Sequence, residues 1–278
     1  MMLPGIHASV SGGLNRALEV LGSSGLPCGQ IFTSNQRRWK GREVKEREKE
    51  EFSRTPISVI SHTSYLINLA SFRNEVRERS FLALSEELLR MHQLGIHWTV
   101  LHPGAHLGEG DATGIRAVAA AVRSILQDAP PDTGVLYENT AGQGTVVGRS
   151  FEQLSDLMDG TGIPGRTGIC LDTCHAFAAG YDLSTRNGVD MVMEEFDSVV
   201  GSSRIRAFHM NDCLGTCGSH LDRHARLGGG LLGLDPLRYL ASLEDFDGIP
   251  GIVETPGTDG DRVADALALT AGEGVSRG

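Results

Sequence analysis

Short apolar runs alternate with stretches of helical spacing along the whole chain. Within residues 115–126 and 81–91, hydrophobic residues recur every three or four positions, which predicts amphipathic helices. Runs of four to six mostly apolar residues between such stretches have the length of buried strands. There are eight of them, at residues 5–10, 28–33, 57–62, 98–102, 134–138, 168–172, 205–210 and 251–254. Eight repeats of a strand followed by a helix predict an α/β fold, a single parallel (β/α)8 TIM barrel.

The chain length agrees with this architecture. The 278 residues allow about 35 for each strand–helix unit. No linker or low-complexity segment interrupts the chain, so we expect one domain over residues 1–278, with a frayed tail at 271–278. The alternative, an open doubly wound sheet, favours a glycine-rich phosphate loop after the first strand. Residues 11–13, Ser-Gly-Gly, match neither G-x-G-x-x-G nor a Walker loop.

Composition and charge narrow the function classes. A content of 40% hydrophobic and 22% charged residues is that of a globular protein, and the net charge of −10, taken alone, argues against nucleic-acid binding. Five cysteines, an odd number, indicate a reducing cytoplasm. We expect no signal peptide and no membrane span, because even the uncharged stretch 55–72 is rich in polar residues. All three lysines lie within residues 40–49, which disfavours a Schiff-base aldolase.

Seven of the eight predicted strands carry a histidine or a carboxylate near their carboxyl end. Active sites of TIM barrels form at that end, so these side chains are expected to converge. One polar residue at a strand end is explained by the strand emerging into solvent. Seven are not, because Ser, Thr, Asn or Lys would be equally suitable at a solvent-exposed strand end, yet all seven are His or carboxylates. The seven residues are His7, His62, His102, Glu138, Asp172, His209 and Glu254.

Two loops add further candidate ligands. His175 follows the sixth strand in a D-x-x-H pair, and Asp222 and His224 form a D-x-H pair after the seventh. With the strand-end residues other than His7 they make nine, a His and carboxylate set typical of Zn²⁺ or Mn²⁺. One Zn²⁺ takes four or five ligands, so we expect two or three ions, an arrangement that commonly serves phosphoester hydrolysis. The charge of three Zn²⁺ ions is +6 and that of the four carboxylate ligands is −4. The remaining charge of +2 could balance an anionic phosphate and a hydroxide.

Long motifs in chain order then identify a resemblance. They are FTSNQR at 32–37, HTSYLINL at 62–69, HPGAH at 102–106, ENTAGQG at 138–144, DTCHAFAAGYD at 172–182, HMND at 209–212, DRH at 222–224 and ET at 254–255. With these motifs the chain resembles the endonuclease IV family, the zinc-dependent apurinic/apyrimidinic (AP) endonucleases of base excision repair. The blocks cover strands two to eight and are highly specific.

The resemblance implies three zinc ions per chain. Cleavage would occur on the 5′ side of an abasic site and leave a 3′-hydroxyl and a 5′-deoxyribose phosphate, with trimming of blocked 3′ ends as a second activity. A hydroxide between the first two ions would attack phosphorus, and the third ion would stabilise the leaving oxygen. Glu138, Asp172 and Glu254 would be catalytic as well as ligands. The implied ligands are His62 and His102 for the first ion, Asp172, His209 and Glu254 for the second with Glu138 bridging both, and His175, Asp222 and His224 for the third.

The loop after the second strand is the predicted DNA contact. In residues 35–42, Arg37, Arg38 and Lys40 lie close to Trp39, a composition that suits phosphate clamping or a wedge between bases. The resemblance implies that Arg37 enters the base stack, assisted by Tyr65 and Leu66, while His7 and Asn35 face the substrate or support the ligands. The implied partner is double-stranded DNA with abasic sites or blocked 3′ ends, bound by a cytoplasmic, nucleoid-associated monomer without membrane contact.

Two departures from the family pattern and three alternatives accompany this interpretation. Leu214 replaces a Lys or polar residue, so one phosphate contact is expected to be missing, and Gly229 replaces an acidic residue, which would loosen the loop of Asp222 and His224. The C-x-x-x-C pairs at 170–174 and 213–217 allow a structural zinc site with loose spacing. A sugar isomerase with one or two ions and a zinc-carrying binder of damaged DNA are the competing functions. His106 and His220 have no assigned role.

Overall fold

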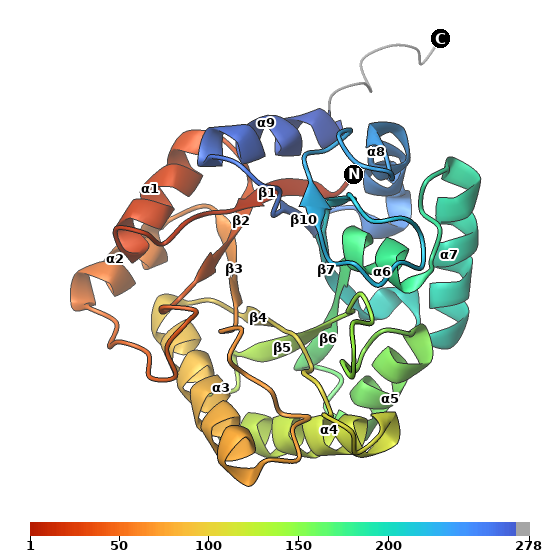
Figure 1. Ribbon diagram of the computed structural model, residues 1–278. Coiled ribbons are helices and arrows are strands. Elements are labelled where there is room, and N and C mark those ends of the chain that lie inside the picture. Colours follow the sequence, from red (N-terminus) through yellow and green to blue (C-terminus); the bar gives the residue numbers. More distant parts are fainter. Residues whose placement is uncertain (271–278) are drawn as a thin grey trace.

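A closed barrel of eight parallel strands forms the centre of the molecule in the computed structural model, which describes residues 1–270 (Figure 1). The strand order around the barrel is β1-β10-β7-β6-β5-β4-β3-β2, and β1 pairs in parallel with both β2 and β10. This closure confirms the predicted (β/α)8 TIM barrel and excludes the open sheet. The strands are β1 (Leu3–His7), β2 (Cys28–Phe32), β3 (Ser58–His62), β4 (Trp98–Leu101), β5 (Gly134–Glu138), β6 (Thr167–Asp172), β7 (Ile205–His209) and β10 (Pro250–Val253).

Seven of these strands agree with the predicted bounds to within one residue. The exception is β1, predicted at 5–10 and observed at Leu3–His7. The strand ends at His7, and the chain then enters the first helix through Gly12 and Gly13, whose φ values are 103° and 102°. The tail predicted to fray, 271–278, lies outside the described residues.

A ring of helices surrounds the barrel (Figure 1). The helix α4 buries one face, which includes Ile115, Val118, Val122 and Leu126, as its spacing predicts. No helix within residues 1–270 combines the length and apolar character needed to cross a bilayer. The helices are α1 (Leu14–Ser24), α2 (Glu46–Arg54), α3 (Asn74–Leu94), α4 (Asp111–Asp128), α5 (Phe151–Thr161), α6 (Thr173–Ala179), α7 (Arg186–Val199), α8 (Leu234–Ser242) and α9 (Asp259–Thr270), with short 3-10 turns at Ser202–Arg204 and Glu244–Phe246.

One element between β7 and α8 was not predicted. Two very short antiparallel strands, β8 (Asp212–Cys213) and β9 (His224–Ala225), form a ribbon at the carboxyl end of the barrel. Two residues are too few to leave a periodic pattern in the sequence. The ribbon brings the D-x-H pair back over the barrel mouth.

Side chains that point into the barrel form two stacked layers. The lower layer is apolar and consists of Cys28, Ile60, Val100, Leu136, Cys170, Ala207 and Ile252. In β1 the matching position is Gly5, where a Cβ would lie 2.7 Å from the carbonyl oxygen of Cys28. Residues two positions apart share a face of a strand, so the next inward residue of every strand belongs to an upper layer. That upper layer is polar in all eight strands and consists of His7, Gln30, His62, His102, Glu138, Asp172, His209 and Glu254.

Candidate metal centre

Side chains able to bind metal ions gather into clusters at the carboxyl end of the barrel. Within each cluster the potential ligand atoms all lie within 4.8 Å of one another. Together the clusters contain all nine residues predicted from the sequence. They are His62, His102 and Glu138; Glu138, Asp172, His209 and Glu254; His175, Asp222 and His224; and an overlapping set of Asp172, Cys174 and His224.

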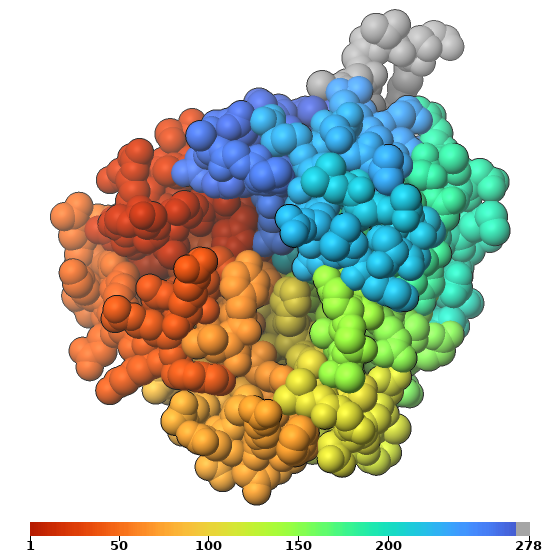
Figure 2. All heavy atoms as spheres, viewed as in Figure 1, coloured from red at the N-terminus to blue at the C-terminus, as the bar shows by residue number. Residues whose placement is uncertain are grey.

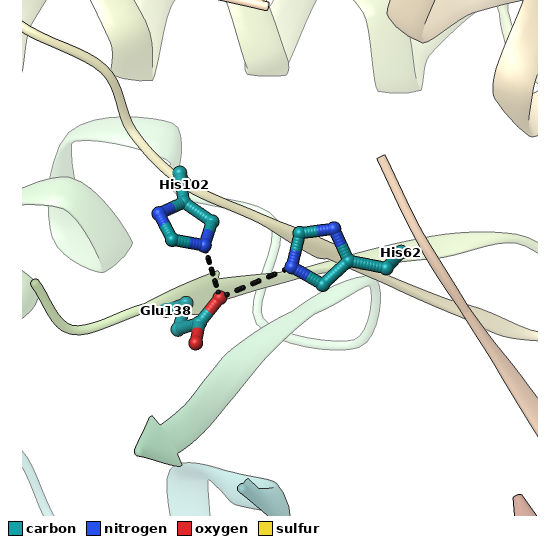
Figure 3. Close-up of side chains that lie close together, drawn as sticks. All are labelled: His62, His102 and Glu138. Atoms are coloured by element: carbon teal, nitrogen blue, oxygen red, sulfur yellow. Dashed lines mark ion pairs between the residues drawn. The ribbon is translucent and has the colours of Figure 1, made fainter. Parts of the chain in front are cut away.

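The first cluster places two imidazole nitrogens against one carboxylate oxygen (Figure 3). His62 Nε2 and His102 Nε2 lie 3.3 and 2.8 Å from Glu138 Oε2. His62 Nδ1 donates to the carbonyl of Thr63 at 2.8 Å, so its Nε2 carries a lone pair. Glu138 Oε2 is buried and has no hydrogen-bond partner among the described residues. A nitrogen lone pair and an anionic oxygen repel each other in a buried site, and a cation bound between them would relieve this repulsion.

The second cluster is organised by a side chain that the sequence analysis did not assign. Gln30, fully buried inside the barrel, places its Oε1 2.9 Å from His209 Nε2. Its Nε2 donates to Glu254 Oε1 at 2.7 Å, and His7 Nδ1 lies 2.6 Å from the same oxygen. The amide therefore accepts a proton from His209 Nε2, and His209 Nδ1 carries the lone pair.

Three carboxylates surround that lone pair. His209 Nδ1 lies 2.8 Å from Glu138 Oε1, 3.1 Å from Glu254 Oε2 and 3.8 Å from Asp172 Oδ2. Glu138 thus presents one oxygen to the first cluster and the other to the second. Such a carboxylate is placed to bridge two cations.

The third cluster repeats the arrangement at the mouth of the barrel. His175 Nδ1 donates to the carbonyl of Asn139 at 3.0 Å, and its Nε2 lies 3.3 Å from Asp222 Oδ1. His224 Nε2 lies 3.4 Å from the same oxygen and is buried without a hydrogen-bond partner among the described residues. The donor set of each cluster therefore fits a divalent cation such as Zn²⁺.

The close packing of carboxylates and imidazoles also shifts their pKa values in the protein without metal. Burial raises the pKa of the Glu138 carboxyl, but His102 and His209 outweigh it and hold that pKa well below its ordinary value. Burial lowers the pKa of His175, yet Asp172, Asp222 and Glu138 raise it well above the usual value. The raised pKa favours the protonated form of His175 in the protein without metal, and a cation bound there would displace that proton.

Two buried asparagines support the carboxylates. Asn139 joins β5 to β6, because it accepts from the backbone N–H of Asp172 at 2.6 Å and donates to the carbonyl of Asp172 at 3.0 Å. Asn211 donates to Asp172 Oδ2 at 2.7 Å and accepts from the backbone N–H of Glu254 at 2.9 Å. Neither residue had a role in the sequence analysis, although each lies within two positions of a strand-end candidate.

The buried carboxylate of Asp212 anchors the segments on either side of the loop that carries Asp222 and His224. The carboxylate of Asp212 is fully buried and accepts hydrogen bonds from backbone N–H groups at 2.8 to 3.0 Å. The donors are Cys213, Gly228, Gly230 and Leu232. Every donor is a main-chain N–H group, and three of the four lie in residues 228–232, here called the glycine segment, so no side chain at position 229 takes part in the anchor. The predicted loosening at Gly229 stays a prediction, as does the missing phosphate contact at the exposed Leu214.

The connection between β2 and α2, residues 33–45 and here called the rim loop, carries the predicted DNA contacts. Arg37, Arg38 and Lys40 are exposed and pair with no carboxylate within residues 1–270. Asn35 Oδ1 accepts from the backbone N–H of Arg37 at 2.9 Å, which shapes the turn. Trp39 packs against the hydrophobic core, so it is not an exposed wedge.

Beside the ligand clusters lies an open pocket of about 660 Å³. His7, Asn35, Tyr65 and Glu254 are among its lining residues, and the middle of this face is recessed between the surrounding loops (Figure 2). The Tyr65 side chain is 61% exposed, with its ring centroid 5.5 Å from that of His62. Leu66, beside it, is half-buried. The pocket therefore opens to solvent directly beside the candidate ligands.

The histidines without an assigned role have structural partners. His106 Nδ1 accepts from the backbone N–H groups of Gly108 and Gly110 at 3.2 and 2.9 Å. His220 Nδ1 donates to the carbonyl of Ala141 at 2.9 Å. Both residues tie down loops at the barrel mouth.

The cysteines give no support to a C-x-x-x-C zinc site. Within residues 1–270, no group of three or more potential ligands contains two cysteines. In the first pair, Cys170 lies in the apolar layer inside the barrel, whereas Cys174 lies with Asp172 and His224. In the second pair, Cys213 is buried and Cys217 is exposed, so the two members of each pair have separate environments.

The fold and the ligand clusters are those of the xylose isomerase-like TIM barrels. The family model of that class matches residues 18–272 of this chain. Proteins called probable endonuclease 4 from Citrifermentans bemidjiense and Geobacter sulfurreducens are 42% and 43% identical over 269 and 263 residues. The first alignment covers 95% of both chains, and the second covers 92% of this chain and 89% of the relative. The chain belongs to the endonuclease IV family.

Solved structures agree with this assignment. Endonuclease IV from Thermus thermophilus matches with a TM-score of 0.84 and 31% identity, covering 96% of this chain and 98% of that chain. A D-tagatose 3-epimerase-like protein matches with a TM-score of 0.73 but only 18% identity, covering 97% and 94%. The second likeness shows the shared barrel alone.

Proposed function

We propose that the protein is a zinc-dependent AP endonuclease that hydrolyses the phosphodiester on the 5′ side of abasic sites in duplex DNA. Products would be a 3′-hydroxyl and a 5′-deoxyribose phosphate, and the same site would trim blocked 3′ ends. The observation that carries the proposal is the pairing of imidazole nitrogens with carboxylate oxygens in each cluster, buried at Glu138 and exposed at Asp222. The names of the relatives, probable endonuclease 4, support the same activity.

Nine side chains would hold three zinc ions in this proposal. Zinc bound there would supply Lewis acidity that stabilises charge on the phosphate oxygens. Glu138 would join the first two positions, because its two oxygens belong to different clusters. Gln30 would hold His209 with Nδ1 toward the carboxylates. The ligand sets would be His62, His102 and Glu138; Glu138, Asp172, His209 and Glu254; and His175, Asp222 and His224.

The DNA would cross the face that bears the rim loop. Arg38 and Lys40 would neutralise backbone phosphates, and Arg37 would enter the base stack, with Tyr65 and Leu66 beside it. Chemistry at an abasic nucleotide requires that it leave the base stack, and protein side chains must fill the gap. Three zinc ions would also change the net charge from −10 to −4, so the anionic total does not oppose binding at this cationic rim.

The decisive experiment is nicking of a duplex that contains one tetrahydrofuran abasic analogue, together with zinc analysis of the purified protein. We expect close to three zinc ions per chain, 5′-side nicking, and loss of nicking when a chelator removes zinc. Asp172→Asn and Glu254→Gln should abolish nicking, whereas Asp159→Asn, a surface control, should not. Full activity in both site variants, or one zinc ion or fewer in active protein, would refute the proposed centre.

The same experiment separates the competing functions. Affinity for the abasic duplex without any nicking by the zinc-loaded protein would indicate a binder of damaged DNA. Isomerisation of a sugar with no effect on DNA would indicate an epimerase, whose barrel this chain shares. Nicking that needs magnesium and not zinc would indicate another type of nuclease.

A further inference from the structure

A buried ion pair lies beneath the rim loop, outside the ligand clusters. It joins Glu87 and Arg90 of α3, whose Oε2 and Nη2 atoms are 2.6 Å apart. Only 3% of Glu87 and 9% of Arg90 are exposed. Burial of two charges is costly, and such a pair is weak evidence for stability by itself. Its contacts with the rim loop indicate what it does.

The pair holds the first residue of the loop. The Thr33 hydroxyl donates to Glu87 Oε2 at 2.6 Å and accepts from Arg90 Nε at 3.0 Å. With the ion pair itself, the three side chains form a closed triangle of polar contacts. Thr33 is the residue at which the chain leaves β2 and enters the rim loop.

The same guanidinium also touches the far part of the loop. At Gly41, a Cβ would overlap Arg90 Nη1 and lie 2.5 Å from Arg90 Cζ. The φ of Gly41 is not in the left-handed region, so glycine is needed there for close approach and not for conformation. Arg90 therefore touches positions 33 and 41, and the segment between them carries Arg37, Arg38 and Lys40.

Arginine suits this position better than lysine would. Its planar group donates from Nε to Thr33 and from Nη2 to Glu87, and its Nη1 edge lies against Gly41 and 3.6 Å from Glu86 Oε2. A lysine ammonium is a single point charge and cannot maintain this flat, two-point contact. Other tethers of the loop involve its middle and its end, since Ser64 donates to the carbonyl of Gln36 at 2.7 Å and Arg42 pairs with Glu48.

We propose that Arg90, held by Glu87, is a positioning residue that sets the rim loop for DNA phosphates. The inference rests on the proposed function, because the loop has a DNA to position against only if the protein acts on DNA. Arg90 itself lies beneath the loop and touches neither the ligand clusters nor the exposed cations. Its loss should therefore change substrate affinity and leave the metal centre intact.

Two variants test the contact from its two sides. Arg90→Lys alters the guanidinium itself, and Gly41→Ala adds a methyl group that displaces the guanidinium from the loop while Glu87 and Arg90 both remain present. Arg166→Lys is the matched control, because Arg166 also donates to several carbonyls, among them Thr133 and Pro130, before the amino end of β6. The zinc-loaded proteins are compared by trypsin cleavage after Arg37, Arg38 and Lys40, by zinc content, and by steady-state nicking.

We expect both variants to keep three zinc ions, to be cut faster within the rim loop, and to show a KM for the abasic duplex raised roughly tenfold with kcat little changed. The dependence of log affinity on log salt should fall by about one unit for each phosphate that the loop no longer binds. Cleavage rates equal to those of Arg166→Lys would overturn the anchoring role. Faster cleavage with unchanged KM and salt dependence would overturn its link to DNA. If the unaltered protein neither nicks nor binds the duplex, the proposed function fails, and trypsin still reports on the anchor separately.

Discussion

Gln30 and His209 are 179 positions apart in the chain, and Gln30 Oε1 accepts the Nε2 proton of His209 at 2.9 Å inside the barrel. The other end of the amide donates to Glu254 Oε1. Outer partners of this kind fix the tautomer and ring orientation of a metal-binding histidine. Gln30 thus connects two of the candidate ligands without being one itself.

The first prediction concerns this contact. Gln30→Met keeps the length of the side chain but removes both hydrogen bonds, so His209 is free to rotate or change tautomer. We expect zinc to be held about 10- to 100-fold more weakly in the second position. Competition with a chromogenic chelator measures this, with Gln143→Met, an exposed position, as the control. Equal zinc retention in the two variants would show that Gln30 does not position His209.

The second prediction concerns Asp212, whose carboxylate accepts the backbone N–H groups of the glycine segment. Asp212→Asn replaces one acceptor oxygen with a donor that faces other donors. We expect a loss of about 1–3 kcal/mol in the free energy of unfolding. We also expect the zinc content to fall from three to two, because the loop of His224 is released. Asp245→Asn, on an exposed turn, is the control, and retention of three zinc ions by Asp212→Asn would contradict the prediction.

The third prediction concerns thiol reactivity. Burial raises the pKa of Cys28 and of Cys170 to about 12, so at pH 8 only about one thiol in ten thousand is ionised at each. Cys217 is exposed, although its pKa is raised as well. Cys174 and Cys213 are buried and out of reach of a reagent, so we expect one fast-reacting thiol per native chain when iodoacetamide labelling is followed by mass spectrometry. The fast phase should vanish in Cys217→Ser, and its persistence would contradict the assignment.

The fourth prediction is a pH dependence at the end of the rim loop. Burial raises the pKa of the Glu48 carboxyl, but hydrogen bonds from Arg42 and from the backbone of Lys45 outweigh it and lower that pKa below 4.5. A carboxyl group whose pKa is lowered by folding stabilises the fold at pH values above its unfolded-state pKa. This stabilisation is lost as the pH falls through the folded-state pKa. Glu48→Gln should therefore cost about 1 kcal/mol at pH 7 and much less near pH 3.

Urea unfolding of both proteins at the two pH values measures the difference. Any zinc held by the proposed centre would leave both proteins in acid, so its loss would cancel in the comparison. Glu46→Gln, exposed on the first turn of α2, is the control. A difference in unfolding free energy that is the same at both pH values would show that the Glu48 charge contributes nothing.

Local pattern was sufficient for the barrel and for the candidate ligands. Strands with period-two alternation place residues such as Ile60 and His62, or Leu136 and Glu138, on the same inward face, one in the apolar layer and the next in the polar layer. The polar residue at each strand end was therefore visible in the sequence. The same rule extended to β2 points to Gln30, two positions after Cys28, but the mostly apolar run continues to residue 33 and places the strand end too late.

The tertiary structure determined the polar contacts that the hydrophobic pattern of the sequence does not predict. The amide of Gln30 meets His209, the carboxylate of Asp212 meets the glycine segment, and Arg90 of α3 meets Gly41, and none of these pairs has a periodic or motif signal. Periodicity reports which face of an element is buried, since that depends on nearest neighbours along one strand or helix. Which polar groups pair across the barrel depends on strand order, register and loop path, and those exist only once the barrel is closed. By itself, the sequence determined the eight strands, their inward faces and the nine candidate ligands, and the tertiary structure decided how those ligands are grouped, oriented and supported.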